Sequence, residues 1–405
     1  MKNHGAVQPS LRIAGLSENG LTALSEARAR LRLDGTEVID LSEGSPDFAP
    51  SNTIREALAN ACKRPDVHGY SAVQGLPSLR SAFLEHLQKR GSDVTNVECI
   101  IGAGSKELIG HLSQALLGHG DVVLVPALAY PFYRAAAQYA GAEVIVYPLT
   151  DDGNYLPELS RVPDEILSRT KLIWLNTPHN PTGAVLPADF LQDLIHFCRA
   201  RQIVVACDLA YSDITFERDF APAPLACGDR SSQFVIEVHS LSKNINIAGW
   251  RVGFLVGDPT IVSYVAQSRT VFGGGSFVPI QLACRFALDH FTLLASEVRE
   301  TYRARADSVV RRLEKAEVCC VRPRGSFYIW AATPDGGCDV AFSKSLLDKT
   351  RVLVTPGSAF GTAGRGWIRL SLTRPPEILD KAIDRLVEFC ADHSVRPKDA
   401  IVNDV

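Results

Sequence analysis

The sequence contains no long apolar run. No window reaches the roughly 18 consecutive apolar residues that a membrane-spanning helix needs. The first residues, from Met1 to Leu16, also lack the continuous apolar stretch of a signal peptide. We therefore expect a protein that neither spans a membrane nor is exported, and we place it in the cytoplasm.

The sequence also lacks a large net charge. Its 42 lysines and arginines nearly balance 45 aspartates and glutamates, which leaves a net charge of -3. A charge this small gives no electrostatic reason to expect nucleic acid as a partner. The chain has no internal repeat, low-complexity tract or helix-turn-helix pattern, which argues against a DNA-binding regulator.

The ten cysteines lack the spacing of a disulfide framework or a zinc site. They are scattered from Cys62 to Cys390 without a repeated C-x-x-C, and the only close pair is Cys319 and Cys320. Such usage is typical of reduced thiols in a cytosolic protein. We expect no bound metal ion.

What the sequence does contain is a regular alternation of strands and helices. The 405 residues exceed the size at which one hydrophobic core stops growing, so we expect more than one lobe. Between about residues 97 and 257, helical patterns separate seven short apolar runs: CIIGAG, VVLVPA, EVIVY, KLIWLNT, QIVVACD, FVIEVHS and VGFLVG. This pattern predicts an α/β fold with a mainly parallel seven-stranded sheet covered by helices on both faces.

The pattern changes after about Phe291. A long charged helix over 296–316 precedes short strands around 319–323, 326–332, 352–357 and 367–373, and a closing helix begins at Pro376. We therefore predict three segments. These are an N-terminal arm that joins the small domain (1–50), a large domain (51–289) and a smaller α/β domain (290–405).

Polar side chains follow the ends of several predicted strands. In open α/β sheets, ligands bind at the carboxyl ends of the strands. The polar residues at these ends are Asn176, Asn180, Asp208, Tyr211, Ser240, Ser242, Lys243 and Arg251. We predict that they meet in one site.

The segments SLSKNINIAGWRVGF and NTPHNPTG resemble the lysine segment and the asparagine loop of the fold-type I pyridoxal-phosphate-dependent aminotransferases. Six further segments resemble the same family in chain order: LSEGSPDF, GYSAVQGLPSLR, GAGSKE, ALAYPFY, DLAYSDITF and WIRLSL. The resemblance extends from about Leu41 to Thr373 and is nearest to the LL-diaminopimelate, aspartate and alanine aminotransferases. It implies the fold-type I architecture, pyridoxal 5'-phosphate as cofactor, and a homodimer.

The resemblance also implies roles for individual residues around the cofactor ring. Lys243 is expected to form a Schiff base with the cofactor aldehyde and to shuttle the proton at the substrate α-carbon. Asp208 is expected to pair with the pyridine nitrogen and keep it protonated, which makes the ring an electron sink. Asn180 and Tyr211 resemble the pair that hydrogen-bonds the phenolic oxygen, and Tyr130 resembles the aromatic residue that stacks on the ring.

The cofactor phosphate is expected at the start of the helix that opens after Gly104. Free amides and the helix dipole favour an anion there. The other expected contacts are Ser105, Lys106, Ser240, Ser242, Arg251 and, from the second subunit, Tyr70. For Lys106, the backbone amide rather than the side chain is a possible ligand.

The substrate contacts are expected from two segments. Alternation in WIRLS puts Arg369 on the face of Trp367 and Ser371, where its guanidinium could hold a carboxylate by two hydrogen bonds. The resemblance to the family's carboxylate-binding arginine implies an α-amino acid as substrate, held also by Asn180.

Glu43 precedes Gly44 in LSEGSPDF, the segment that closes over the substrate in the family. A carboxylate at this point could receive a cationic side chain, such as a guanidinium or a distal ammonium. A solvated Glu43 without a role in binding is the alternative. The run from Val271 to Ser276 is expected to project toward the neighbouring subunit.

Together these motifs predict transamination, in which an amino group passes from an amino acid through the cofactor to a 2-oxo acid. The same residues also suit an alternative without transamination. That alternative is elimination, cyclisation or oxidation of a basic amino acid such as an arginine derivative. The motifs indicate the cofactor and leave this choice open.

Overall fold

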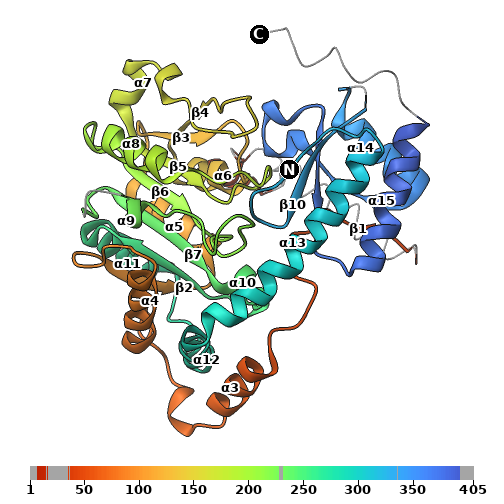
Figure 1. The fold of residues 1–405 in the computed structure, drawn as a ribbon. Coiled ribbons are helices and arrows are strands. Elements are labelled where there is room, and N and C mark those ends of the chain that lie inside the picture. Colours follow the sequence, from red (N-terminus) through yellow and green to blue (C-terminus); the bar gives the residue numbers. More distant parts are fainter. Residues whose placement is uncertain are drawn as a thin grey trace, which may run out of the picture.

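The computed structural model describes residues 7–14, 16, 35, 37–227, 231–334 and 336–392. A seven-stranded sheet with helices on both faces forms one side of the molecule, and a smaller sheet with its own helices forms the other (Figure 1). Much of the predicted arm 1–50 lies outside the described residues, and the predicted domain boundaries remain predictions. Among the helices that the structure describes, none is long and apolar enough to cross a membrane.

All seven predicted strands form, and they join one large sheet. Its strands are β2 (Glu98–Gly102), β3 (Val122–Pro126), β4 (Glu143–Tyr147), β5 (Thr170–Asn176), β6 (Val204–Asp208), β7 (Val235–Ser240) and β8 (Gly253–Gly257). Their order is β2-β8-β7-β6-β5-β3-β4, and β8 alone runs antiparallel to its neighbours. The strands are apolar on both faces because helices cover both, as is usual for parallel sheets.

Two layers of helices enclose this sheet. One face is covered by α5 (Ser105–Leu116), α6 (Phe132–Ala140) and α11 (Pro259–Phe272). The other is covered by α4 (Pro77–Lys89), α8 (Ala188–Arg199) and α12 (Val278–Asp289). Helix α8 buries Leu191, Leu194, Ile195 and Cys198 on one face, and Phe190 packs partly buried beside them. Further helices are α1 (Leu11–Ala14), α3 (Asn52–Cys62), α7 (Asp164–Arg169), α9 (Pro224–Cys227) and α10 (Leu241–Asn244).

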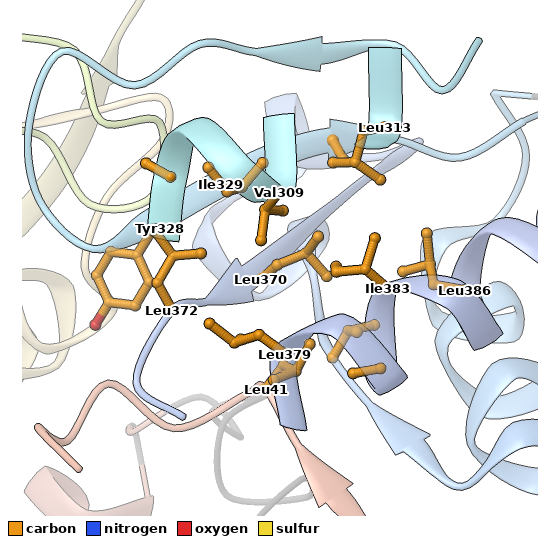
Figure 2. Close-up of a cluster of buried hydrophobic side chains, with 14 of the residues drawn as sticks. Leu41, Val309, Leu313, Tyr328, Ile329, Leu370, Leu372, Leu379, Ile383 and Leu386 are labelled. Atoms are coloured by element: carbon orange, nitrogen blue, oxygen red, sulfur yellow. The ribbon is translucent and has the colours of Figure 1, made fainter. Parts of the chain in front are cut away.

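The smaller sheet has four strands in the order β12-β13-β10-β9. These are β9 (Cys320–Val321), β10 (Tyr328–Ala332), β12 (Thr355–Pro356) and β13 (Trp367–Ser371), packed against α13 (Phe291–Lys315) and α15 (Pro376–Ala391). Figure 2 shows aliphatic side chains of α13, β13 and α15 filling the space between them, with the hydroxyl of Tyr328 directed away. One helix here, α14 (Asp339–Thr350), was not predicted from the sequence.

A short strand near the start of the described chain joins the small lobe. Strand β1 (Ile39–Asp40) pairs in parallel with β11 (Val352–Leu353). The amide of Ser371 also donates to the carbonyl of Leu41 at 2.8 Å. This pairing fixes the next residues, 42–44, which we call the strap, against β13.

Candidate active site

A cavity of about 380 Å³ lies at the carboxyl ends of β5, β6 and β7. Its lining includes every predicted site residue except Gly104 and Tyr70. The lining residues that the sequence analysis did not place in the site are Ser42, Tyr133, Ala210 and Tyr328. Strand ends, the strap and the small sheet therefore contribute to one cavity.

Lys243 projects into this cavity from α10, a helix of four residues. The helix is capped by Ser240, whose hydroxyl accepts the amide of Ser242 at 3.1 Å. The Lys243 Nζ donates to the carbonyl of Gly44 in the strap at 2.6 Å. Burial, followed by the charges of Arg251 and Arg369, lowers the Lys243 pKa to about 8. More of the Lys243 side chain is therefore in the neutral amine form near neutral pH than for an ordinary lysine, and only this form attacks a carbonyl carbon.

Asp208 is the last residue of β6 and is buried at the base of the cavity. One carboxylate oxygen accepts the hydroxyl of Tyr133 at 2.7 Å, and the other accepts the amide of Ala210 at 3.0 Å. Burial raises the Asp208 pKa, and these two hydrogen bonds oppose that rise. The Tyr133 ring stacks on Trp174 at 4.9 Å, which fixes the donor.

Arg369 faces the cavity from β13, while Ile368 and Leu370 lie in the small-lobe core. Its guanidinium donates to the Asn180 side-chain oxygen at 2.8 Å and to the carbonyl of Ser42 at 2.7 Å. It lies over the Tyr328 ring, 4.0 Å from the centroid. Because Arg369 is buried and held on both sides, its position against the cavity is fixed.

The hydroxyls of Tyr211 and Tyr328 lie 3.1 Å apart on the same side of the cavity. Asn176 fixes the neighbouring loop, because its side chain accepts the amide of Asn180 at 2.7 Å and donates to the carbonyl of Asp208 at 2.9 Å. The amide of Asn180 and the β6 end are thus joined through one side chain.

Basic side chains line the cavity beside the start of α5. Gly104 caps α5 with a φ of 88°, and a Cβ at this position would collide with the Arg251 guanidinium. Arg251 itself donates to the carbonyls of Ala103 at 2.9 Å and Ala248 at 3.0 Å. The Lys106 ammonium lies over the Phe132 ring, 4.7 Å from its centroid. The cavity lining therefore combines a buried carboxylate, a lysine and, beside the start of α5, an arginine.

The chain is similar to one known protein family over most of its length. Residues 36–386 match the family described as aminotransferase class I and II. An LL-diaminopimelate aminotransferase of Dehalococcoides mccartyi is 38% identical over 382 residues, covering 94% of this chain and 98% of that protein. The chain belongs to the class I and II aminotransferases. A second LL-diaminopimelate aminotransferase, from Nitratidesulfovibrio vulgaris, is 35% identical over 93% of this aminotransferase and 98% of its own chain.

Solved structures show the same fold. Substrate-bound BacF from Bacillus subtilis superposes on this aminotransferase with a TM-score of 0.90 at 30% identity, covering 95% of this chain and 98% of BacF. An aspartate aminotransferase from Thermotoga maritima gives a TM-score of 0.87 at 27% identity, covering 95% and 100%. The predicted fold-type I architecture and aminotransferase activity are confirmed, and the family implies pyridoxal phosphate as the cofactor.

The cavity of this aminotransferase fits that cofactor. A carboxylate suits the protonated pyridine nitrogen, and Arg251 beside the α5 N-terminus suits a phosphate. Glycine is required at position 104 because any side chain would fill the space beside Arg251. The lining thus holds partners for the charged groups that a phosphorylated pyridine aldehyde presents.

Two predicted residues lie in different surroundings. Tyr70 is fully exposed and does not line the cavity of its own chain. Glu43 does line the cavity, and its carboxylate is close enough to raise the Lys243 pKa against the effect of burial. The Glu43 carbonyl also accepts the hydroxyl of Thr373 at 2.9 Å, which fixes the strap to the end of β13.

Sequence reasoning missed Tyr133 and Tyr328. Tyr133 lies in ALAYPFY, but its partner Asp208 is 75 residues away, and nothing local indicates that contact. Tyr328 does have a signal, because β10 pairs with β13 so that Tyr328 faces Ser371 and Trp330 faces Arg369. The register of that pair, had it been known, would have placed Tyr328 near Arg369.

Proposed function

We propose that this aminotransferase carries pyridoxal 5'-phosphate on Lys243 and moves the α-amino group of an amino acid to a 2-oxo acid. The observation that carries the proposal is that Lys243, Asp208 and Arg369 line one cavity. When bound, the cofactor supplies an aldehyde that takes up the amino group and a protonated ring that accepts electrons.

The protein's own groups divide this work. Asp208, ordered by Tyr133, holds a proton on the pyridine nitrogen, and Tyr130 covers the ring. Tyr211 and Asn180 donate to the phenolic oxygen. Lys243, with its lowered pKa, takes the proton from the substrate α-carbon and would then donate it to the cofactor.

The phosphate lies at the α5 N-terminus in this proposal. Ser105 and Lys106 contribute backbone amides, since the Lys106 ammonium is engaged with Phe132. The remaining ligands are Ser240, Ser242 and Arg251. Gly104 leaves the room that Arg251 occupies.

Arg369 holds the substrate α-carboxylate, with Asn180 beside it. The strap closes this end, and glycine is needed at position 44 because a Cβ there would collide with the Tyr328 hydroxyl. The Lys243 Nζ donates to the Gly44 carbonyl and would have to lose its proton and leave that carbonyl to hold the cofactor as the neutral amine. The strap is then free to hold the substrate.

We also propose a cytoplasmic homodimer in which Tyr70 completes the phosphate site of the partner subunit. The proposal is supported by the full exposure of Tyr70 and by exposed apolar side chains nearby, including Phe277 and Val271. The ring centroid of Phe277 lies 6.3 Å from that of His68, close to Tyr70 in the chain. Burial of such side chains favours association.

For the substrate, we propose an amino acid whose side chain carries a distal cation. The support is Glu43, which lines the cavity, together with relatives named LL-diaminopimelate aminotransferase. Glu43→Gln should raise the KM for lysine, ornithine or LL-diaminopimelate about tenfold and leave that for norleucine unchanged. The exposed Glu388→Gln serves as control. Equal KM values for both classes in Glu43→Gln and wild type would exclude Glu43 from recognition.

The experiment that tests the main proposal presents single amino acids to the purified, cofactor-loaded protein without any 2-oxo acid. Absorbance and product mass are followed together. Conversion to the pyridoxamine form with one equivalent of 2-oxo acid is the expected result. A dehydrated, cyclised or oxidised product would instead establish the alternative without transamination.

A further inference from the structure

Arg269 of α11 is a fully buried arginine that lies outside the cavity. Its side chain is 1% exposed. Its Nε lies 3.3 Å from a carboxylate oxygen of Glu107. A buried guanidinium is costly unless its donors are satisfied, so the protein has arranged several acceptors around it. All but one of these acceptors belong to segments that are distant in sequence.

On one side, Arg269 is connected by hydrogen bonds to the start of α5, where the phosphate site is proposed. Glu107 is in the first turn of α5, and its other oxygen accepts the amide of Ala103. The Ala103 carbonyl in turn accepts the Arg251 guanidinium at 2.9 Å. An acid in the first turn of α5 would repel a phosphate dianion, and Arg269 offsets that charge.

On the other side, Arg269 is hydrogen-bonded to the segment that carries Tyr70. Its Nη1 donates to the carbonyls of Ile101, at 2.6 Å, and Val73, and its Nη2 donates to the carbonyl of Gly274 at 3.2 Å. We call residues 70–76 the Tyr70 segment. Arg269 therefore holds the base of this segment against the end of β2.

Gln281 strengthens the same attachment and is 0% exposed. Its side chain accepts the amide of Leu76 at 2.7 Å and donates to the carbonyl of Ser276 at 2.6 Å. The Ser71 hydroxyl donates to that same carbonyl at 2.8 Å, and Gly275 lies so near Ser71 that a Cβ would not fit. The Tyr70 segment is thus fixed at its base while the Tyr70 side chain stays exposed.

We propose that Arg269 is a positioning residue that links the phosphate site of its own subunit to the Tyr70 segment that the subunit gives its partner. This inference rests on the proposed cofactor and homodimer. Cofactor binding orders the α5 start, Glu107 transmits that order to Arg269, and Arg269 fixes the Tyr70 segment. Because coupling between two binding events is reciprocal, cofactor should strengthen subunit association and association should strengthen cofactor binding.

The test measures two equilibria in wild type and in Arg269→Lys, which keeps the charge but loses the planar fork of donors. Absorbance titration of the cofactor-free protein gives the dissociation constant for pyridoxal phosphate. Sedimentation velocity gives the dimer dissociation constant with and without the cofactor. In wild type, cofactor should tighten the dimer at least about tenfold. In Arg269→Lys, that tightening should fall to less than about threefold, with cofactor affinity reduced about tenfold.

Arg305→Lys is the matched control. Arg305 is also buried and pairs with one carboxylate, Asp47, and one carbonyl, that of Leu372, but it lies in α13 and holds the small lobe. It should lose thermal stability as Arg269→Lys does and keep the wild-type coupling.

The outcomes separate this inference from the function on which it rests. A wild type that binds no pyridoxal phosphate would defeat the proposed function. A wild type that binds it without tightening the dimer, or an Arg269→Lys protein with wild-type coupling, would overturn the inference. If Arg269→Lys does not fold, Glu107→Gln decides. The two contacts use different Glu107 oxygens, and in glutamine one of these is replaced by an NH2 that would face a donor of Arg269 or Ala103, so coupling should fall at least threefold. Wild-type coupling in Glu107→Gln would again overturn the inference.

Discussion

Tyr133→Phe should slow amino-group transfer while leaving the fold nearly intact. The substitution removes the hydroxyl that donates to Asp208 at 2.7 Å and keeps the ring that stacks on Trp174. A hydrogen bond to a charged group contributes about 1.5–3 kcal/mol, so its loss should raise the Asp208 pKa. This rise adds to the one that burial already causes.

A more basic carboxylate draws the shared proton away from the pyridine nitrogen, and a neutral ring would accept electrons less well. The rate constant of the half-reaction with an amino acid should therefore fall roughly 10- to 100-fold. Stopped-flow absorbance without 2-oxo acid measures this step directly. The affinity for pyridoxal phosphate should fall as well.

Tyr147→Phe is a close control for this experiment. Its hydroxyl is also buried and donates at the same distance, 2.7 Å, but to the carbonyl of Trp174. Each variant should lose about 1–3 kcal/mol of unfolding free energy, and only Tyr133→Phe should be slow. Equal half-reaction rates in the two variants would refute the role given to the Tyr133 hydroxyl.

Three further outcomes are expected. Arg369→Lys should raise the KM for the amino acid about 10- to 100-fold in steady-state assays, because lysine cannot form the two-pronged contact with a carboxylate. The absorbance of the bound cofactor should not change. An unchanged KM would show that Arg369 does not bind the substrate carboxylate. Loading of pyridoxal phosphate onto the cofactor-free protein should speed up as pH rises through about 8, where Lys243 becomes neutral, and Glu43→Gln should move that midpoint lower; a midpoint that moves upward would contradict the charge assignment. His179 is buried, and its pKa is lowered from 6.5 to about 4, so the unfolded chain takes up the proton at a higher pH than the folded chain does. The free energy of unfolding should therefore fall by up to about 3 kcal/mol as the pH drops from 6.5 to 4. Urea unfolding at pH 7 and pH 5 should show a smaller fall in His179→Gln than in wild type, and an equal fall would mean that other groups cause it.

The large sheet could be predicted because its signal is local. Each strand from β2 to β8 is a short apolar run between helical patterns, and the residues after the strand ends meet because parallel strands end at one edge. Alternation alone was enough to put Arg369 on the face opposite Ile368 and Leu370. These features need no knowledge of distant contacts.

What the sequence concealed depends on distant partners. The contact between Tyr133 and Asp208 joins α6 to the end of β6, and no spacing rule relates the two. Helix α14 escaped notice because few of its side chains are buried, among them Ser343, Leu346 and Leu347, so its apolar stripe is weak. Arg269 gave no signal either, since its acceptors come from four separate segments.

The pairing of the strap with the small lobe has a consequence for synthesis on the ribosome. The Ser42 carbonyl and the Arg369 guanidinium that meet over the cavity are 327 residues apart. A nascent chain that has already delivered Asp208 and Lys243 still lacks this cover, since Arg369 comes 126 residues after Lys243 (369 minus 243). At ~5–20 residues per second, translation needs roughly 6–25 s to close that gap. During this interval the lysine is present without the arginine that would hold its substrate, so the growing chain can meet free aldehydes before it can select an amino acid.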